Sequence, residues 1–276
     1  MHIRLFILLF FLPIWIQAQP PQLFRYFTEK DGLSDNRVQA LLRDNRGFLW
    51  VGTANGLNRF NGYGFQHYLP SQNKPEFTIS NESINGLCQD TSGKIWIATQ
   101  DGLNCYFPET GKFRVWRAVT SQAGSLPNSV VKNIYLDPFN TLWLSCDNRD
   151  LARYDPLSDQ FITYPWRDFV METHPQLLPD SYLIIYFIEQ KAPHELWLQS
   201  NAGLFSFHTE SQQFTFYPIP QPLQEAKTVS NCPETFYYGT WENDVLRYDP
   251  CTDTHTQVRL PLGKMVTGGR RLVTDV

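Results

Sequence analysis

The sequence predicts an all-β protein, a β-propeller made of four-stranded blades, and three observations support this prediction. A phrase built around Trp recurs along the chain. Each copy is flanked by short stretches of strand type and by Gly, Asp and Asn turns. Aromatic residues make up 15% of the 276 residues and charged residues only 18%, a composition that favours pleated sheets. A period in the forties with four short strands per unit is typical of a propeller blade.

The repeated phrase fixes the number of units. Residues 44–60 align without a gap with residues 90–106. Further copies surround Trp143 and Trp197, and a divergent fifth copy has Tyr237 in place of Trp. We therefore expect about five blades plus the start of a sixth, which together form an incomplete seven-bladed ring.

Each unit is predicted to contain four strands in a fixed order. An apolar inner strand lines the central channel, and an Asp-x-x-Gly or Asp-x-x-Asn turn follows it. The Trp strand comes next; its rings pack between blades, and its Gly or Ala allows the adjacent sheet to approach. A third strand and an aromatic outer strand complete the blade. The inner strands are 38–42, 84–88 and 131–135, and the outer strands, aromatic at their first and fourth positions, are 65–68, 113–116, 161–164 and 214–217. We expect Trp50, Trp96, Trp143 and Trp197 to be core residues and not sugar-stacking platforms.

The two ends of the chain carry separate predictions. Residues 1–18 have the basic start, apolar run and small-residue end of a secretory signal peptide, with cleavage expected after Ala18; an uncleaved anchor is the alternative. Residues 19–276 are assigned to the propeller. Residues 24–27 have the aromatics of an outer strand, which in a closed ring completes the last blade. Residues 271–276 look like the inner strand of a sixth unit, so we expect the front portion of a longer protein; a five-bladed ring is the alternative.

These phrases resemble a known family. Gly-Leu-Ser-Asp-Asn at 32–36, followed by the Trp-Val-Gly-Thr and Gly-Leu-Asn-Arg-Phe phrases within 49–60, is similar to the two-component regulator propeller repeat. The resemblance implies the periplasmic sensor of a Bacteroidetes-type hybrid or related sensor histidine kinase. It implies further propeller blades, a membrane helix and a kinase domain downstream in the full-length parent, for which a homodimer is also an expectation. It also implies glycan-derived or other small extracellular ligands.

Several chemistries find no support in the residues. The net charge of −4 offers no basic surface for nucleic acid. There is no nucleophile elbow, zinc-protease pair or phosphate-binding loop, and none of the six His residues lies in a phospho-acceptor context. The Asp-x-x-Gly turns lack the oxygen ligands of a calcium loop. The five Cys residues show no zinc spacing, and most are expected to be small buried residues. We therefore predict no catalytic residue, cofactor or metal.

Ligand binding is predicted on the loops. The longest departures from the repeat are 71–82 and 166–179, and the second carries the candidate ligand-binding residues Trp166, Arg167, Asp168 and His174, with Glu172 beside them. The alternative is an ordinary solvated insertion. The leading hypothesis is a non-catalytic periplasmic sensor. A secreted propeller lyase or hydrolase, or an adhesive module, is the rival; an enzyme would need acidic or His side chains on several inner strands, which here are mainly apolar or amide-bearing.

Overall fold

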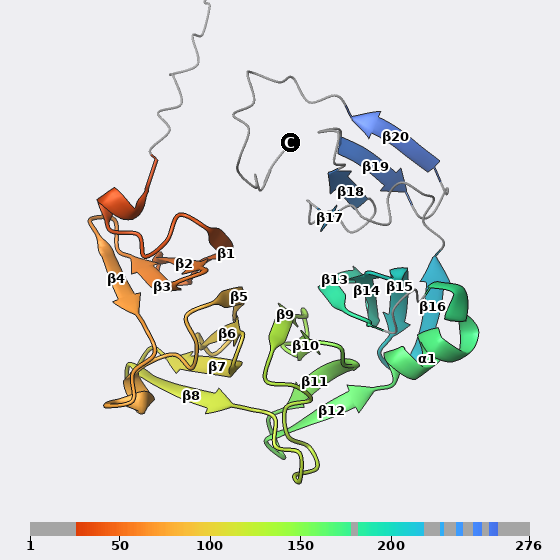
Figure 1. Cartoon of the computed structure of the whole chain (residues 1–276), viewed down its shortest axis with the longest axis horizontal. Helices are drawn as coiled ribbons and strands as arrows, with labels where there is room; N and C mark the ends of the chain where they lie inside the picture. The colour runs from red at the N-terminus through yellow and green to blue at the C-terminus, as the bar shows by residue number, and fades with distance from the viewer. Residues whose placement is uncertain are drawn as a thin grey trace, which may run out of the picture.

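The structure is a computed structural model that describes residues 26–177 and 182–217, together with four strands between 227 and 258. In this part of the chain the strands form five four-stranded antiparallel sheets, which are arranged as blades around a common axis (Figure 1). The predicted all-β propeller with four-stranded blades is confirmed.

The strands of each blade follow chain order across the sheet. The first blade contains β1 (Val38–Arg43), β2 (Leu49–Thr53), β3 (Gly56–Phe60) and β4 (Phe65–Tyr68). The second contains β5 (Ile84–Gln89), β6 (Ile95–Thr99), β7 (Gly102–Phe107) and β8 (Lys112–Trp116). The third contains β9 (Val131–Leu136), β10 (Leu142–Cys146), β11 (Leu151–Asp155) and β12 (Gln160–Tyr164). The fourth contains β13 (Ile185–Ala192), β14 (Glu195–Ser200), β15 (Gly203–His208) and β16 (Gln213–Tyr217), and the fifth β17 (Lys227–Thr228), β18 (Phe236–Gly239), β19 (Val245–Asp249) and β20 (Thr254–Val258). The helices are η1 (Glu29–Asp31), η2 (Pro75–Phe77), α1 (Trp166–Thr173) and η3 (Pro175–Leu177).

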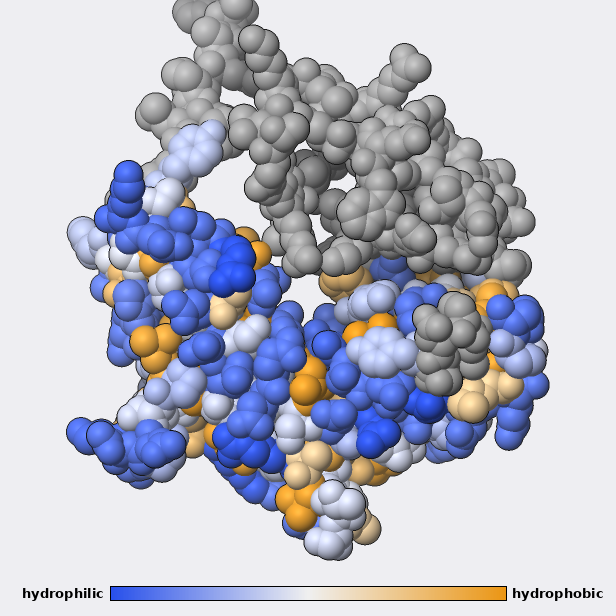
Figure 2. Space-filling view, viewed as in Figure 1, coloured by the Kyte–Doolittle hydropathy of each residue, from blue (hydrophilic) through white to orange (hydrophobic). Residues whose placement is uncertain are grey.

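The first strands of successive blades lie side by side around the axis. β5 contacts both β1 and β9, and β9 contacts β13. Figure 2 shows one face of the molecule, on which the hydrophobic residues of the described part are scattered and not gathered into one patch. The predicted inner strands are thus confirmed, and the predicted outer strands coincide with β4, β8, β12 and β16.

The chain order gives each blade two distinct ends. We call one end the connection face, because it carries the links between blades and the turns that join second to third strands. The other end, the hairpin face, carries the turns that join first to second and third to fourth strands. The turn residues 44–47, 90–93 and 137–140 therefore lie on the hairpin face, and helix α1, which links β12 to the fourth blade, lies on the connection face.

The Trp side chains fill the spaces between blades. Trp50 is 1% exposed, and its ring lies 5.6 Å from Tyr68 of its own outer strand and 5.2 Å from Tyr106 of the next blade. The same arrangement recurs with Trp96, Trp116 and Tyr154, and with Trp143, Tyr164 and Phe207. Since Trp197 is 2% exposed as well, all four indoles are core residues, as predicted.

Each Asp of the repeated turn also holds the indole of its blade. The Oδ1 atom of Asp44 accepts hydrogen bonds from the amides of Arg46 and Phe48, and its Oδ2 atom accepts one of 2.8 Å from Trp50 Nε1. Asp90 and Asp137 repeat the three bonds with Trp96 and Trp143. The predicted turn chemistry is confirmed, because Gly47 at the fourth turn position has a φ of 87°. The bond to the indole is a second role that the turn alone did not reveal.

A glycine in the Trp strand brings two blades together. A Cβ atom placed on Gly52 would lie 2.5 Å from the Cγ2 atom of Ile84, which begins the next inner strand and is fully buried. The predicted close approach of adjacent sheets at this position is therefore confirmed.

The segment before the first blade packs as an outer strand would. The Phe27 ring lies 4.8 Å from Phe60 and 5.6 Å from Phe65. Tyr68 contacts Tyr106 and Phe113 of the second blade in the same way, at 5.7 and 5.4 Å. Phe27 thus takes the place of the fourth aromatic of a preceding outer strand.

Some predictions fall outside the described residues. These are the signal peptide at 1–18, the first two residues of the predicted outer strand at 24–27, the inner strand at 271–276, and Cys232 and Cys251. Among the described Cys residues, Cys105 and Cys146 are buried free thiols, as expected, and Cys88 is a partly buried free thiol.

Candidate functional site

The predicted ligand-binding stretch forms a helix at the junction of blades 3 and 4. Residues 166–173 fold into α1, which lies beside β16 at the edge of the ring (Figure 1). The alternative prediction, an ordinary solvated insertion, is wrong for the side of α1 that faces the blades. Trp166 and Val170 are fully buried in the core between the two blades, and the Trp166 ring meets Phe205 edge-on at 5.6 Å. Of the four candidates, Trp166 is therefore a packing residue with no surface for a ligand.

The next residue, Arg167, joins a polar cluster on the connection face. Its backbone amide donates a 2.8 Å bond to Asp150, and its guanidinium donates to the side-chain oxygen of Asn148. Asn148 has a φ of 48° in the turn between β10 and β11, and its side-chain oxygen also accepts from the Leu183 amide at 3.2 Å. Arg167 thereby links α1 to the turn between β10 and β11. Through Asn148, the same contacts reach Leu183, which precedes β13.

Asp147 links the same turn to the wall of the channel. Its carboxylate accepts a 3.0 Å bond from Lys132 of β9 and a bond from the hydroxyl of Tyr182. Burial opposes ionisation of this carboxyl, but the bonds from Tyr182 and Lys132 outweigh it and lower the pKa of Asp147. Burial and the neighbouring carboxylate raise the pKa of Tyr182 to about 12. The cluster therefore presents a lysine, a carboxylate and a phenol that are already bonded to one another at neutral pH.

Asp150 behaves differently from Asp147. Burial is the largest influence on its carboxyl and raises its pKa, with the nearby Asp168 carboxylate adding to the effect. The amide of Arg167 only partly offsets this. Asp150 is thus the more readily protonated of the two carboxylates.

The remaining candidates lie apart from this cluster. Asp168 is exposed on the outer side of α1. His174 follows the helix at its other end, where its ring lies 4.5 Å from Phe216 of the outer strand. Because α1 has eight residues, the helix ends are about 10 Å apart. The structure thus brings Arg167 together with Lys132, Asp147 and Tyr182, which sequence reasoning missed, and places His174 elsewhere.

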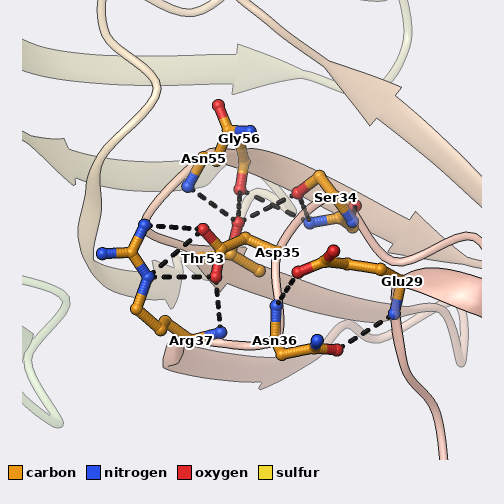
Figure 3. A network of polar contacts seen from close by, with 9 residues as sticks. Glu29, Ser34, Asp35, Asn36, Arg37, Thr53, Asn55 and Gly56 are labelled. Carbon is orange, nitrogen blue, oxygen red and sulfur yellow. Dashed lines mark hydrogen bonds and ion pairs between the residues drawn. The ribbon is translucent and has the colours of Figure 1, made fainter.

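The connection face of blade 1 is closed by a different network (Figure 3). The Thr53 hydroxyl donates to the Gly56 carbonyl at 2.9 Å and lies 2.9 Å from the Ser34 hydroxyl, which accepts from Asn58. Blade 2 repeats this arrangement with Ser80, Thr99 and Asn104. In blade 3 the position of Asn58 and Asn104 is taken by Ala152 of β11, which has no side-chain amide. The cluster around Asp147 and Asn148 therefore replaces the repeated network in blade 3.

The channel wall carries few groups suited to acid–base chemistry. Of the four inner strands with described side chains, only β13 carries a carboxylate, Glu189, and burial raises its pKa to about 7. Glu189 was not singled out from the sequence, because β13 was not among the predicted inner strands. No group of three or more His, Cys, Asp or Glu side chains suited to a metal occurs among the described residues. No helix of the part that the structure describes is long and apolar enough to cross a bilayer.

Sequence comparison with known proteins shows which family the repeats resemble. The two-component regulator propeller family matches residues 32–55 and 78–101, which lie in the first two units. A histidine kinase of Formosa agariphila is 44% identical over 75 residues, which is 27% of this chain and 5% of the relative. The first two units thus match two-component regulator propeller repeats. The predicted resemblance to this repeat is confirmed.

Solved structures agree with this assignment. The extracellular domain of a hybrid two-component system of B. thetaiotaomicron superposes with a TM-score of 0.69 at 25% identity, over 84% of this chain and 31% of that one. Virginiamycin B lyase of Staphylococcus aureus superposes with a TM-score of 0.58 at 17% identity, over 84% of this chain and 73% of the lyase, and shows the fold alone. The chain thus spans a small part of the signalling proteins that it resembles.

Proposed function

We propose that this propeller is the ligand-binding sensor of a two-component signalling protein, acts in the periplasm, and responds to oligosaccharides or other small extracellular molecules. The observation that carries the proposal is that the sequence match and the structural match fall on the same part of the chain. The two units matched by the regulator propeller family are blades of the same ring that superposes on an extracellular two-component domain. The kinase itself would belong to other parts of the signalling protein.

The connection face of blades 3 and 4 is the surface that we propose for ligand contact. Loops held on a rigid scaffold are where binding residues concentrate. Here the helix is fixed by Trp166 and Val170 in the core, so Arg167 and the Asp147 turn are presented with little freedom. Donors and acceptors on such a rigid surface suit a hydroxyl-rich ligand.

A secreted propeller enzyme is less well supported. The lyase that shares the fold is an enzyme, but its identity of 17% carries no information on activity. An acid–base mechanism requires titratable groups that face one another. On the four described inner strands the single carboxylate is that of Glu189, and no His is present.

A binding screen tests the proposal. The purified chain is heated in the presence of neutral and acidic oligosaccharides, monosaccharides and amino acids, and its unfolding temperature is recorded. A ligand at 100 times its Kd stabilises the folded state by about 2.7 kcal/mol, an increase that a thermal scan resolves. A shift that Arg167→Ala removes and Asp168→Ala leaves intact supports the proposal. A folded chain with no shift for any member of the panel contradicts it.

A further inference from the structure

The hairpin face holds a second feature at the same junction, a cleft between blades 3 and 4. The cleft has a volume of about 330 Å³, at the lower end of the range found for small-molecule sites. Its walls include Arg153 and Tyr164 of blade 3, and His194 and Gln212 of the turns of blade 4. It lies at the opposite end of the blades from the Asp147 cluster and is independent of it.

The guanidinium of Arg153 is the only cation with a fixed charge among the residues that line this cleft. Its Nε atom donates a 2.8 Å bond to the Tyr164 hydroxyl, and among the described residues no carboxylate forms an ion pair with it. Asp137 also lines the cleft, but its two oxygens accept from two amides and from Trp143 Nε1. That carboxylate is therefore occupied by its own turn.

Blade 1 shows how an aromatic ring can cover an arginine at this position. Arg59 and Arg153 occupy the same register, each opposite the Trp of its blade. The guanidinium of Arg59 lies 4.6 Å from the centre of the Phe48 ring, which packs over it. Phe48 follows Asp44 by four residues, and Thr141 follows Asp137 by four. Because a threonine replaces the phenylalanine, the space above Arg153 is open.

A flat aromatic wall stands beside this opening. Phe139, two residues before Thr141, is 59% exposed, and its ring stacks on His194 of the neighbouring blade at 4.9 Å with an angle of 17° between planes. An aromatic face favours a ring compound, and an uncovered guanidinium favours a carboxylate. Gln212 adds an amide that can hydrogen-bond a polar substituent.

We propose that this cleft binds a small ring compound bearing a carboxylate, with the carboxylate on Arg153 and the ring against Phe139 and His194. A sugar acid and an aromatic acid share this chemistry. The proposal does not depend on the proposed sensor function. The cleft lies on the hairpin face, whereas the ligand surface proposed above lies on the connection face.

Calorimetric titration of the full chain tests the proposal with two matched pairs of probes, glucuronate with glucose and benzoate with benzamide. We expect one acid to bind at least tenfold more tightly than its neutral counterpart, and the pair that responds identifies the ring. Arg153→Gln should weaken this binding at least tenfold. Arg59→Gln, the matched control in blade 1, should leave it within twofold.

A second variant separates ligand loss from misfolding. Thr141→Phe restores the arrangement of blade 1, so it should fold with an unchanged circular dichroism spectrum and still lose binding at least tenfold. The proposal is overturned if neither acid binds saturably, if acid and neutral probes bind alike, or if a folded Thr141→Phe chain binds as the parent does.

Discussion

Substitution of Gly52 by Ala tests how closely two blades approach. The added Cβ atom would lie 2.5 Å from Ile84 Cγ2 and 2.9 Å from Ile84 Cβ, and both distances are well below ordinary contact. Ile84 is fully buried, so it cannot swing into solvent to relieve the clash. Overpacking of this kind costs about 1–3 kcal/mol. For a chain of this size the unfolding temperature should fall by roughly 2–12 °C.

The matched control is Gly64→Ala in the turn between β3 and β4. A Cβ atom at Gly64 meets nothing within 4 Å. Both substitutions reduce the entropy of the unfolded chain by a similar amount, worth about 0.4–1 kcal/mol in favour of folding. The difference between the two variants therefore isolates the clash. Urea unfolding followed by Trp fluorescence measures both free energies.

A double variant then assigns the clash to its partner. Ile84→Ala alone should cost about 2–5 kcal/mol, because it leaves a cavity. Combined with Gly52→Ala, it removes the Cγ2 atom that the new methyl would strike, so the pair should cost less than the sum by at least about 1 kcal/mol. A Gly52→Ala chain as stable as Gly64→Ala, or strictly additive costs, would show that the blades can separate freely here and would refute the packing argument.

Three further predictions concern single side chains. Asp44→Ala removes the acceptor of the buried Trp50 indole and should destabilise the fold by about 2–3 kcal/mol in urea unfolding, whereas Asp101→Ala, which breaks an exposed ion pair, should change it by less than about 0.5 kcal/mol. Burial raises the pKa of Glu189 from 4.5 to about 7, so the contribution of Glu189 to stability should be fully present below pH 4.5 and fall on the order of 2–3 kcal/mol as the pH rises to 7. The difference in unfolding free energy between the parent and Glu189→Gln should therefore change by this amount between pH 4.5 and 7, and a difference that does not vary with pH would refute the assignment. Trp166→Ala should cost about 3–5 kcal/mol and Asp168→Ala almost nothing, and equal effects on thermal unfolding would argue that α1 is not anchored in the core.

The blade architecture could be predicted because one residue pattern serves the same packing role in each unit. An indole in the second strand needs an aromatic partner in its own outer strand and another in the next blade, so Trp50, Tyr68 and Tyr106 recur as a set. The Asp–Trp hydrogen bond was missed although its spacing of six residues is constant. Turn chemistry already explained the Asp, so nothing in the sequence required a second role.

The candidate site was predictable only as a location. The stretch from 166 onward departs from the repeat, and Arg167 does contribute to the polar cluster. The partners of Arg167 come from turns of blade 3, whose polar residues look like any others in a loop. Trp166 was misplaced because a short helix with one apolar side has too few residues to show its periodicity. Tertiary contacts, not local propensity, determine such elements.

Several departures from the repeat lie at the junction of blades 3 and 4, on both the connection face and the hairpin face. In blade 4 a lysine, Lys191, stands six residues before the Trp where blades 1 to 3 have Asp, and its ammonium lies 4.5 Å from the Trp197 ring. In blade 3 Ala152 replaces the side-chain amide that closes the connection face in blades 1 and 2, and Thr141 stands where blade 1 has the ring that covers Arg59. A fold maintained by repetition tolerates such losses only where other contacts compensate, as the α1 core and the Asp147 cluster do here. Residues released from the repeated packing are those that selection for a ligand can change, so the junction of blades 3 and 4 is where binding should be sought first.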